Sequence, residues 1–178
     1  MPTRTRLEPR HLPHLPPAAA WPRRPARGRL TARGDAAYIR PVRYLGIDVG
    51  RATLGLAVAD DVLRTAHGLQ SLRRTADAED LAAVRRAVEA YEVTRIVVGL
   101  PLNMDGTEGA SARLARAYAA KLGQALEIPV ELFDERLSTF EAELRLRERG
   151  ISSREQRSVI DAEAAAVILQ GWLDSRRR

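Results

Sequence analysis

YLGIDVGRATLGLAVAD, the segment from Tyr44 to Asp60, decides the fold. Apolar residues alternate with small or polar ones in 44–50 and again in 53–60, which is the period of a β-strand. The link between the two runs, Gly50-Arg51-Ala52, is short enough to join neighbouring antiparallel strands. We therefore expect the sheet to begin with a β-hairpin.

The sequence after the hairpin alternates between strand and helix patterns. Helices are expected at 77–91 and 110–126, where apolar residues recur at helical spacing. Short strands are expected at 68–72 and 130–133. The run RIVVGL (Arg95–Leu100) is apolar throughout, which is typical of a parallel strand covered on both faces.

Two capping-box patterns indicate further helices near the C-terminus. Ser138-Thr-Phe-Glu141 opens a helix expected to end at Gly150, and Ser152-Ser-Arg-Glu155 opens one expected to run to about Asp174. The order of elements predicts an α/β fold, a mixed sheet with an antiparallel hairpin, parallel strands and helices on both faces.

The charge divides the 178 residues into two parts. Residues 1–40 hold nine arginines against two acidic residues, and residues 41–178 carry a net charge of −1. The first part is also rich in proline, so we expect a disordered extension followed by one folded domain. Two interpretations stay open: a basic arm that contacts phosphate backbones, and an extension without a function.

Several classes of site are excluded by composition. The chain has no cysteine and only three histidines, which excludes disulfides, thiolate chemistry and metal sites built on sulfur or histidine clusters. No apolar run reaches the ~20 residues of a membrane span, and prolines interrupt the N-terminal segment. We expect a cytoplasmic protein with no membrane partner.

Three carboxylates stand at positions that favour a site. Asp48 lies in the first strand between Gly46 and Gly50, glycines that would let a large ligand approach. At the second position, Asp134, Glu135 and Arg136 directly follow the strand at 130–133, and ligands bind at such strand ends in α/β sheets. Asp161 shares an apolar helical stripe with Ala165, Ile168 and Trp172, where an acid is costly unless it is paired.

A set of oxygen donors without histidine or cysteine suits a hard cation, Mg²⁺ or Mn²⁺. The chemistry typical of such a set is hydrolysis of a phosphodiester by metal-activated water, with two ions ~4 Å apart. The polar connection at 101–109 could add to this site. Asp105 or Glu108 could approach a metal and Asn103 or Thr107 a phosphate, although an ordinary loop would have the same composition.

Four motifs in this order resemble the RuvX (YqgF) family. They begin at Gly46-Ile-Asp48-Val-Gly50, at Val98-Gly-Leu-Pro-Leu-Asn-Met-Asp-Gly-Thr, at Asp134-Glu-Arg-Leu-Ser-Thr139 and at Ile160-Asp-Ala162. The resemblance implies a ribonuclease H-like nuclease domain over 41–178 and a role in maturing the 5′ end of pre-16S rRNA in ribosome biogenesis.

The resemblance also implies roles for single residues. It assigns catalysis and metal binding to Asp48, Glu135 and Asp161, the acids that the pattern of strands and helices had indicated. Contacts with the nucleic-acid substrate are expected from the following residues: Arg51, Asn103, Arg136 and Thr139. The hairpin departs from the family, because Ala52-Thr53 stands where members usually carry a Lys-Arg pair.

Two alternatives to rRNA processing stay open. A Holliday-junction resolvase would act on branched DNA and is expected to be a homodimer, because it cuts two strands symmetrically. A nucleic-acid-binding regulator would use the same fold with a vestigial site. The sequence does not separate RNA from DNA as the substrate, since sites that recognise phosphates read shape.

Overall fold

The computed structural model describes residues 41–137 and 154–176. The expected extension (residues 1–40), the helix expected to begin at Ser138, and Thr139 lie outside the described residues. Among the helices that are described, none combines the length and the apolar character needed to cross a membrane.

A five-stranded mixed sheet forms the centre of the domain, in the order β3-β2-β1-β4-β5. The first three strands pair antiparallel, whereas β4 pairs parallel with both β1 and β5. This order confirms the predicted ribonuclease H-like class. The strands are β1 (Arg43–Val49), β2 (Thr53–Asp60), β3 (His67–Arg73), β4 (Arg95–Leu100) and β5 (Val130–Asp134).

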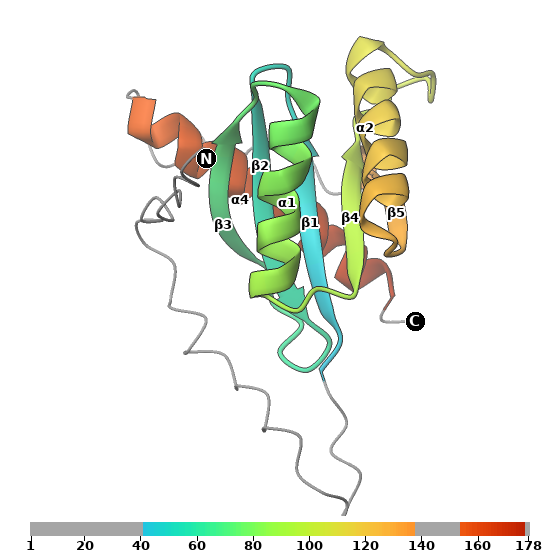
Figure 1. Ribbon diagram of the computed structural model, residues 1–178. Coiled ribbons are helices and arrows are strands. Elements are labelled where there is room, and N and C mark those ends of the chain that lie inside the picture. The colour runs from blue at the N-terminus through green and yellow to red at the C-terminus, as the bar shows by residue number, and fades with distance from the viewer. Residues whose placement is uncertain (1–40, 138–153, 177–178) are drawn as a thin grey trace, which may run out of the picture. The chain divides into compact units, whose positions relative to one another are not determined.

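Helices cover both faces of the sheet (Figure 1). One face carries α1 (Asp77–Ala90) and α2 (Ala110–Leu126), and the other carries α4 (Arg154–Ser175). A single turn of 3-10 helix, η2 (Glu135–Leu137), directly follows β5. The helix expected at 110–126 and the strands expected at 53–60 and 95–100 have the predicted bounds, and the other expected elements that are described differ from prediction by a few residues at their ends.

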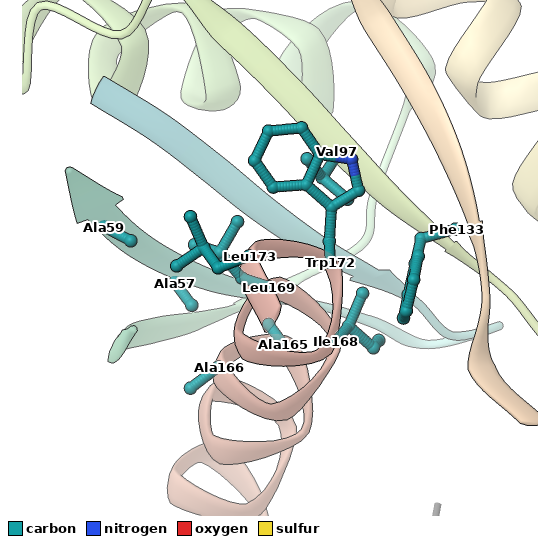
Figure 2. Packing of buried hydrophobic residues seen from close by; sticks show 10 residues of the cluster. All are labelled: Ala57, Ala59, Val97, Phe133, Ala165, Ala166, Ile168, Leu169, Trp172 and Leu173. Carbon is teal, nitrogen blue, oxygen red and sulfur yellow. The ribbon is translucent and has the colours of Figure 1, made fainter. Parts of the chain in front are cut away.

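On the face under α4, β2 contributes alanines to the buried cluster, and the helix contributes its largest side chain, Trp172 (Figure 2). Because the strands present alanine and glycine here, α4 approaches their backbone closely: a Cβ atom at Gly46 would lie 2.7 Å from the Leu169 Cβ. The buried cluster consists of Ala57, Ala59, Val97, Phe133, Ala165, Ala166, Ile168, Leu169, Trp172 and Leu173.

Gly46 therefore has a different role from the one expected. Its missing side chain makes room for α4, and the missing side chain of Gly50 makes room for the Thr53 carbonyl oxygen, which would lie 3.0 Å from a Cβ atom at Gly50. The interpretation that these glycines admit a ligand beside Asp48 is wrong, because protein atoms already occupy the space.

The strands β1, β3, β4 and β5 run in one direction, so their C-terminal ends share one edge of the sheet, which we name the carboxyl edge. This is the upper edge in Figure 1, where the hairpin link lies. Arg74 braces it: its backbone N–H donates to the Ala52 carbonyl at 2.9 Å and its guanidinium to the Gly50 carbonyl at 3.1 Å. The same guanidinium pairs with the buried Asp80 at 3.2 Å.

Candidate active site at the carboxyl edge

Asp48 stands near the end of the central strand β1, on the face that α4 covers. It pairs across β1 and β2 with Gly55, and Gly55 pairs in turn with Ser71 of β3. Paired residues of antiparallel strands share a face, so the three form a row across the sheet. Burial, and then the nearby charge of Asp161, raise the pKa of the Asp48 carboxyl to about 6.

Asp161 approaches this row from α4. The helix passes so close to β2 that a Cβ atom at Gly55 would overlap the Asp161 carbonyl group. The Ser71 hydroxyl donates a hydrogen bond of 2.8 Å to the Asp161 Oδ2. The backbone of Asp161 thus lies against Gly55, and its side chain is held by a serine on the edge strand.

Glu135 reaches the site from η2, one residue past the end of β5. Its Oε1 lies over Gly99 of β4, so that a Cβ atom at this glycine would collide with the carboxylate. Burial raises the pKa of Glu135 to about 7, with further contributions from the charges of Asp48 and Asp134. A glycine on β4 and a short helical turn after β5 therefore aim this acid at the interior of the site.

The electrostatic couplings place Asp48 between the other two acids. Asp161 raises its pKa, and Asp48 in turn raises the pKa of Glu135. In the described ranges, no group of three His, Cys, Asp or Glu side chains has the geometry to hold a metal ion as it stands. The donors themselves are carboxylate oxygens, which suit Mg²⁺ or Mn²⁺.

The loop at 101–109 is organised by its own side chains. The Asn103 Nδ2 donates to the Thr107 Oγ1 at 2.8 Å, and the Thr107 hydroxyl donates to the Asp105 Oδ1 at 2.7 Å. Gly106 has a φ of 85°, a left-handed conformation that favours glycine. Asp105 thus accepts bonds within the loop, and Glu108 pairs with Arg116 of α2, so neither acid is directed at the three carboxylates.

Arg136 ties this loop to the end of β5. Its guanidinium pairs with Asp134 at 2.6 Å and donates to the carbonyl oxygens of Asn103 and Met104, each at 3.4 Å. The hydrogen bond from Arg136 holds the pKa of the Asp134 carboxyl below its usual value. Of the other expected substrate contacts, Asn103 is exposed on the loop and Arg51 is exposed on the hairpin link.

Ser71 is the contact that sequence reasoning missed. Nothing in the pattern of β3 separates this serine from an ordinary residue of an edge strand, because its role depends on the register with β2. The strand expected at 68–72 was the one available signal. It places Ser71 on the same face as Asp48 only once the pairing of β3 with β2 is known.

A mixed sheet in this strand order, with acidic side chains at its carboxyl edge and one acid on the last helix, is the arrangement expected from the resemblance to a ribonuclease H-like nuclease. The family model described as "RuvX: Holliday junction resolvase" matches residues 42–175. This match covers most of the chain, and the chain belongs to the RuvX family.

Relatives agree with this assignment. A protein of Anaeromyxobacter dehalogenans (strain 2CP-1) named "Putative pre-16S rRNA nuclease" is 67% identical over 135 residues, which cover 76% of this chain and 98% of the relative. A Myxococcus xanthus protein of the same name is 48% identical over 136 residues, covering 76% of this chain and 90% of the relative. A solved structure of Thermus thermophilus RuvC with a Holliday junction substrate aligns with a TM-score of 0.48 at 16% identity, covering 76% of this chain and 95% of that one.

Proposed function

We propose that the chain is a cation-dependent endonuclease whose reacting groups are Asp48, Glu135 and Asp161. The observation that carries the proposal is the coupling of these acids at the carboxyl edge. Asp48 interacts unfavourably with both others, and two of the three carboxyls have pKa values raised to about 6 and 7. Clustered, partly buried acids of this kind are costly for folding and are typical of functional sites.

Mg²⁺ or Mn²⁺ fits this donor set, because a divalent cation supplies the positive charge that the acids lack. Asp48, Glu135 and Asp161 would hold it, and their side chains would have to draw closer together than they stand here. The chemistry supplied by such cations, in the two-ion arrangement we propose, is activation of a water molecule and stabilisation of the leaving oxygen. The protein's part is to fix the three carboxylates from three separate elements.

The substrate we favour is structured RNA, with cleavage at the 5′ end of pre-16S rRNA in the cytoplasm. The support is the printed name of relatives that are 48–67% identical to this chain over nearly their whole length. The expected substrate contacts Arg51 and Asn103 are exposed, on the hairpin link and on the loop, and are therefore accessible to a nucleic acid. Thr139 remains a further expected contact.

A Holliday-junction resolvase is the second candidate, favoured by the description of the matching family model. The two candidates differ in assembly, because symmetric cleavage of a four-way junction requires a homodimer. Sedimentation of the protein with and without a junction measures this directly. A monomer that cleaves the RNA alone would exclude the resolvase.

The experiment that tests the proposal offers a pre-16S fragment and a four-way DNA junction to the wild type and to Asp48→Asn. We expect Mg²⁺- or Mn²⁺-dependent cleavage by the wild type and a loss of at least about a thousandfold in the variant, since one of three cation-holding charges is gone. Asp174→Asn is the matched control, because this exposed aspartate lies thirteen residues beyond Asp161 on the same helix. We expect its activity to be unchanged.

Full cleavage by Asp48→Asn would reject this active site. A wild type that binds either substrate tightly and cleaves neither, with binding unaffected by Asp48→Asn, would support the non-catalytic regulator instead.

A further inference from the structure

The edge strand β3 presents an arginine next to the acidic row. Ser71, in the row with Asp48 and Gly55, is followed two residues later by Arg73, which pairs with Thr53. Side chains two residues apart on a strand lie on the same face. Arg73 is therefore on the face of the three acids, one row nearer the carboxyl edge.

This guanidinium is exposed and forms no hydrogen bond or ion pair with another side chain in the part of the chain that the structure describes. Three other arginines near this edge are already engaged within the protein. Arg74 pairs with Asp80, Arg116 with Glu108, and Arg136 with Asp134. Arg73 therefore keeps its guanidinium N–H donors available for a ligand, and the place of β3 at the border of the sheet leaves that side without a neighbouring strand.

A second exposed arginine, Arg51, lies on the hairpin link two residues before Thr53, the strand partner of Arg73. We call Arg51 and Arg73 the arginine rim. Like Arg73, Arg51 has no side-chain partner among residues 41–137 and 154–176. The rim thus places two uncompensated positive charges beside a site whose own side chains are acidic.

A nucleic-acid strand needs positive charges next to the three acids in order to bind there. The three acids repel a polyanion, and this repulsion must be offset for a phosphodiester to approach them. Guanidinium groups offset it well, because their planar N–H donors match the non-bridging oxygens of a phosphate in a bidentate contact. Arg73 lies on the same face as Asp48 and nearer the carboxyl edge, so a nucleic-acid strand bound there leads into the row of acids.

We propose that Arg73, with Arg51 beside it, is a phosphate-binding site that holds the backbone of the nucleic acid next to the linkage at the acids. The inference rests on the proposed nuclease function and adds a contact from β3, where the sequence had indicated contacts only from the hairpin, the loop and the segment after β5. The site recognises the charge and spacing of the phosphates along the nucleic-acid backbone, and not the base sequence.

The test compares Arg73→Gln with Arg86→Gln in the full chain. Arg86 is an exposed arginine on α1 that likewise has no partner among the described side chains, so both variants lose one surface charge. Binding of a fluorescent pre-16S fragment and of a four-way junction is measured in EDTA, so that no cleavage occurs, over a series of salt concentrations. We expect Arg73→Gln to weaken binding about tenfold and to reduce the slope of log K against log salt by about 1, whereas Arg86→Gln changes neither.

Arg73→Lys distinguishes charge from geometry. We expect it to keep the wild-type salt slope, because the charge remains, and to bind more weakly than the wild type, because the bidentate contact is lost. Thermal unfolding of each variant verifies that the fold is intact, and Arg73→Lys keeps the test decisive if the glutamine variant is unstable.

The outcomes separate this inference from the proposed function. If Arg73→Gln and Arg73→Lys bind with the affinity and slope of Arg86→Gln, the phosphate site is rejected while the nuclease proposal stands. A wild type that binds neither nucleic acid even at low salt would overturn the nuclease proposal, and the inference with it.

Discussion

Asp48 is the residue of the site that interacts unfavourably with both of the other acids. Its carboxyl is partly buried on a strand and interacts with two further acids, one from α4 and one from η2. In the unfolded chain the same carboxyl is hydrated and far from the other two. The folded protein therefore binds a proton at Asp48 and at Glu135 more tightly than the unfolded chain does.

This difference predicts the pH dependence of stability. A carboxyl whose pKa is raised on folding stabilises the fold at pH values below its pKa in the unfolded chain. This contribution is lost as the pH rises through the folded-state pKa values of about 6 and 7. The free energy of unfolding should therefore fall between about pH 4 and pH 7. Asp48→Asn, which cannot ionise, should exceed the wild type by about 1–3 kcal/mol at pH 8 and match it near pH 4.

Urea unfolding in EDTA at several pH values measures these free energies. Asp174→Asn is the control and should follow the wild type throughout. A constant difference between Asp48→Asn and the wild type at every pH would contradict the raised pKa.

A separate prediction concerns Ser71, an uncharged residue that orients the carboxylate of Asp161. Its 2.8 Å hydrogen bond leaves the Asp161 Oδ1 available and limits rotation of the carboxylate. Ser71→Ala should weaken Mn²⁺ binding, measured by calorimetry, about tenfold, which is the usual size for a residue that supports a metal ligand. Ser71→Thr keeps the hydroxyl and should restore most of the affinity, whereas equal losses in both variants would indicate a packing effect instead.

The contact between α4 and the sheet is what brings the third acid into place. Gly55 permits this contact, because any Cβ atom there would overlap the backbone of Asp161. Backbone atoms cannot rotate away as the end of a side chain can, so the helix itself would have to move. Seating of α4 and assembly of the site thus depend on the same glycine.

Gly55→Ala should consequently lower the free energy of unfolding by about 3 kcal/mol, at the upper end for an overpacked core, and should also suppress cleavage. Gly123→Ala is the matched control. It lies in α2, where the nearest atom to a Cβ is the Val130 Cγ2 at 3.8 Å, and it should stabilise the protein by up to about 1 kcal/mol. Urea titrations of both variants measure the change. Equal effects of the two substitutions would contradict the role of Gly55.

The regular pattern of apolar and polar residues explains why the described elements could be predicted from the sequence. The hairpin strands and the apolar run at Arg95–Leu100 each signal their structure locally, and Asp161 was identified because an acid on an apolar stripe is conspicuous. The roles of Gly46, Ser71 and Arg73 could not be predicted, because they depend on which strands are neighbours and in which register. Arg136 has the expected place but bonds to Asp134 and the loop, a partnership that spacing alone does not reveal.

At the scale of the molecule, the excess positive charge of the chain resides outside the family match, which begins at residue 42. The nine arginines of residues 1–40 therefore all lie before the residues that the family model matches. We therefore expect residues 42–175 to fold and to cleave without this segment.

Removal of residues 1–40 should leave the thermal midpoint and the cleavage rate at saturating substrate unchanged. It should reduce the affinity for nucleic acid and the salt dependence of binding, because up to seven net positive charges are lost. Calorimetric melting and binding at several salt concentrations check both parts. An unchanged salt slope would reject the basic-arm interpretation and favour an extension without a function.

Trp172 is packed where its fluorescence should report on the position of α4 and thus on activity. This indole lies on α4 eleven residues after Asp161, 4.9 Å from the Tyr44 ring between centroids, and donates to Glu131 at 3.0 Å. Without residues 1–40 it is the only tryptophan. Local release of α4 would shift its emission to the red and withdraw Asp161 at the same moment, while the circular dichroism of the strands persists. Fluorescence will thus follow the loss of catalysis ahead of global unfolding.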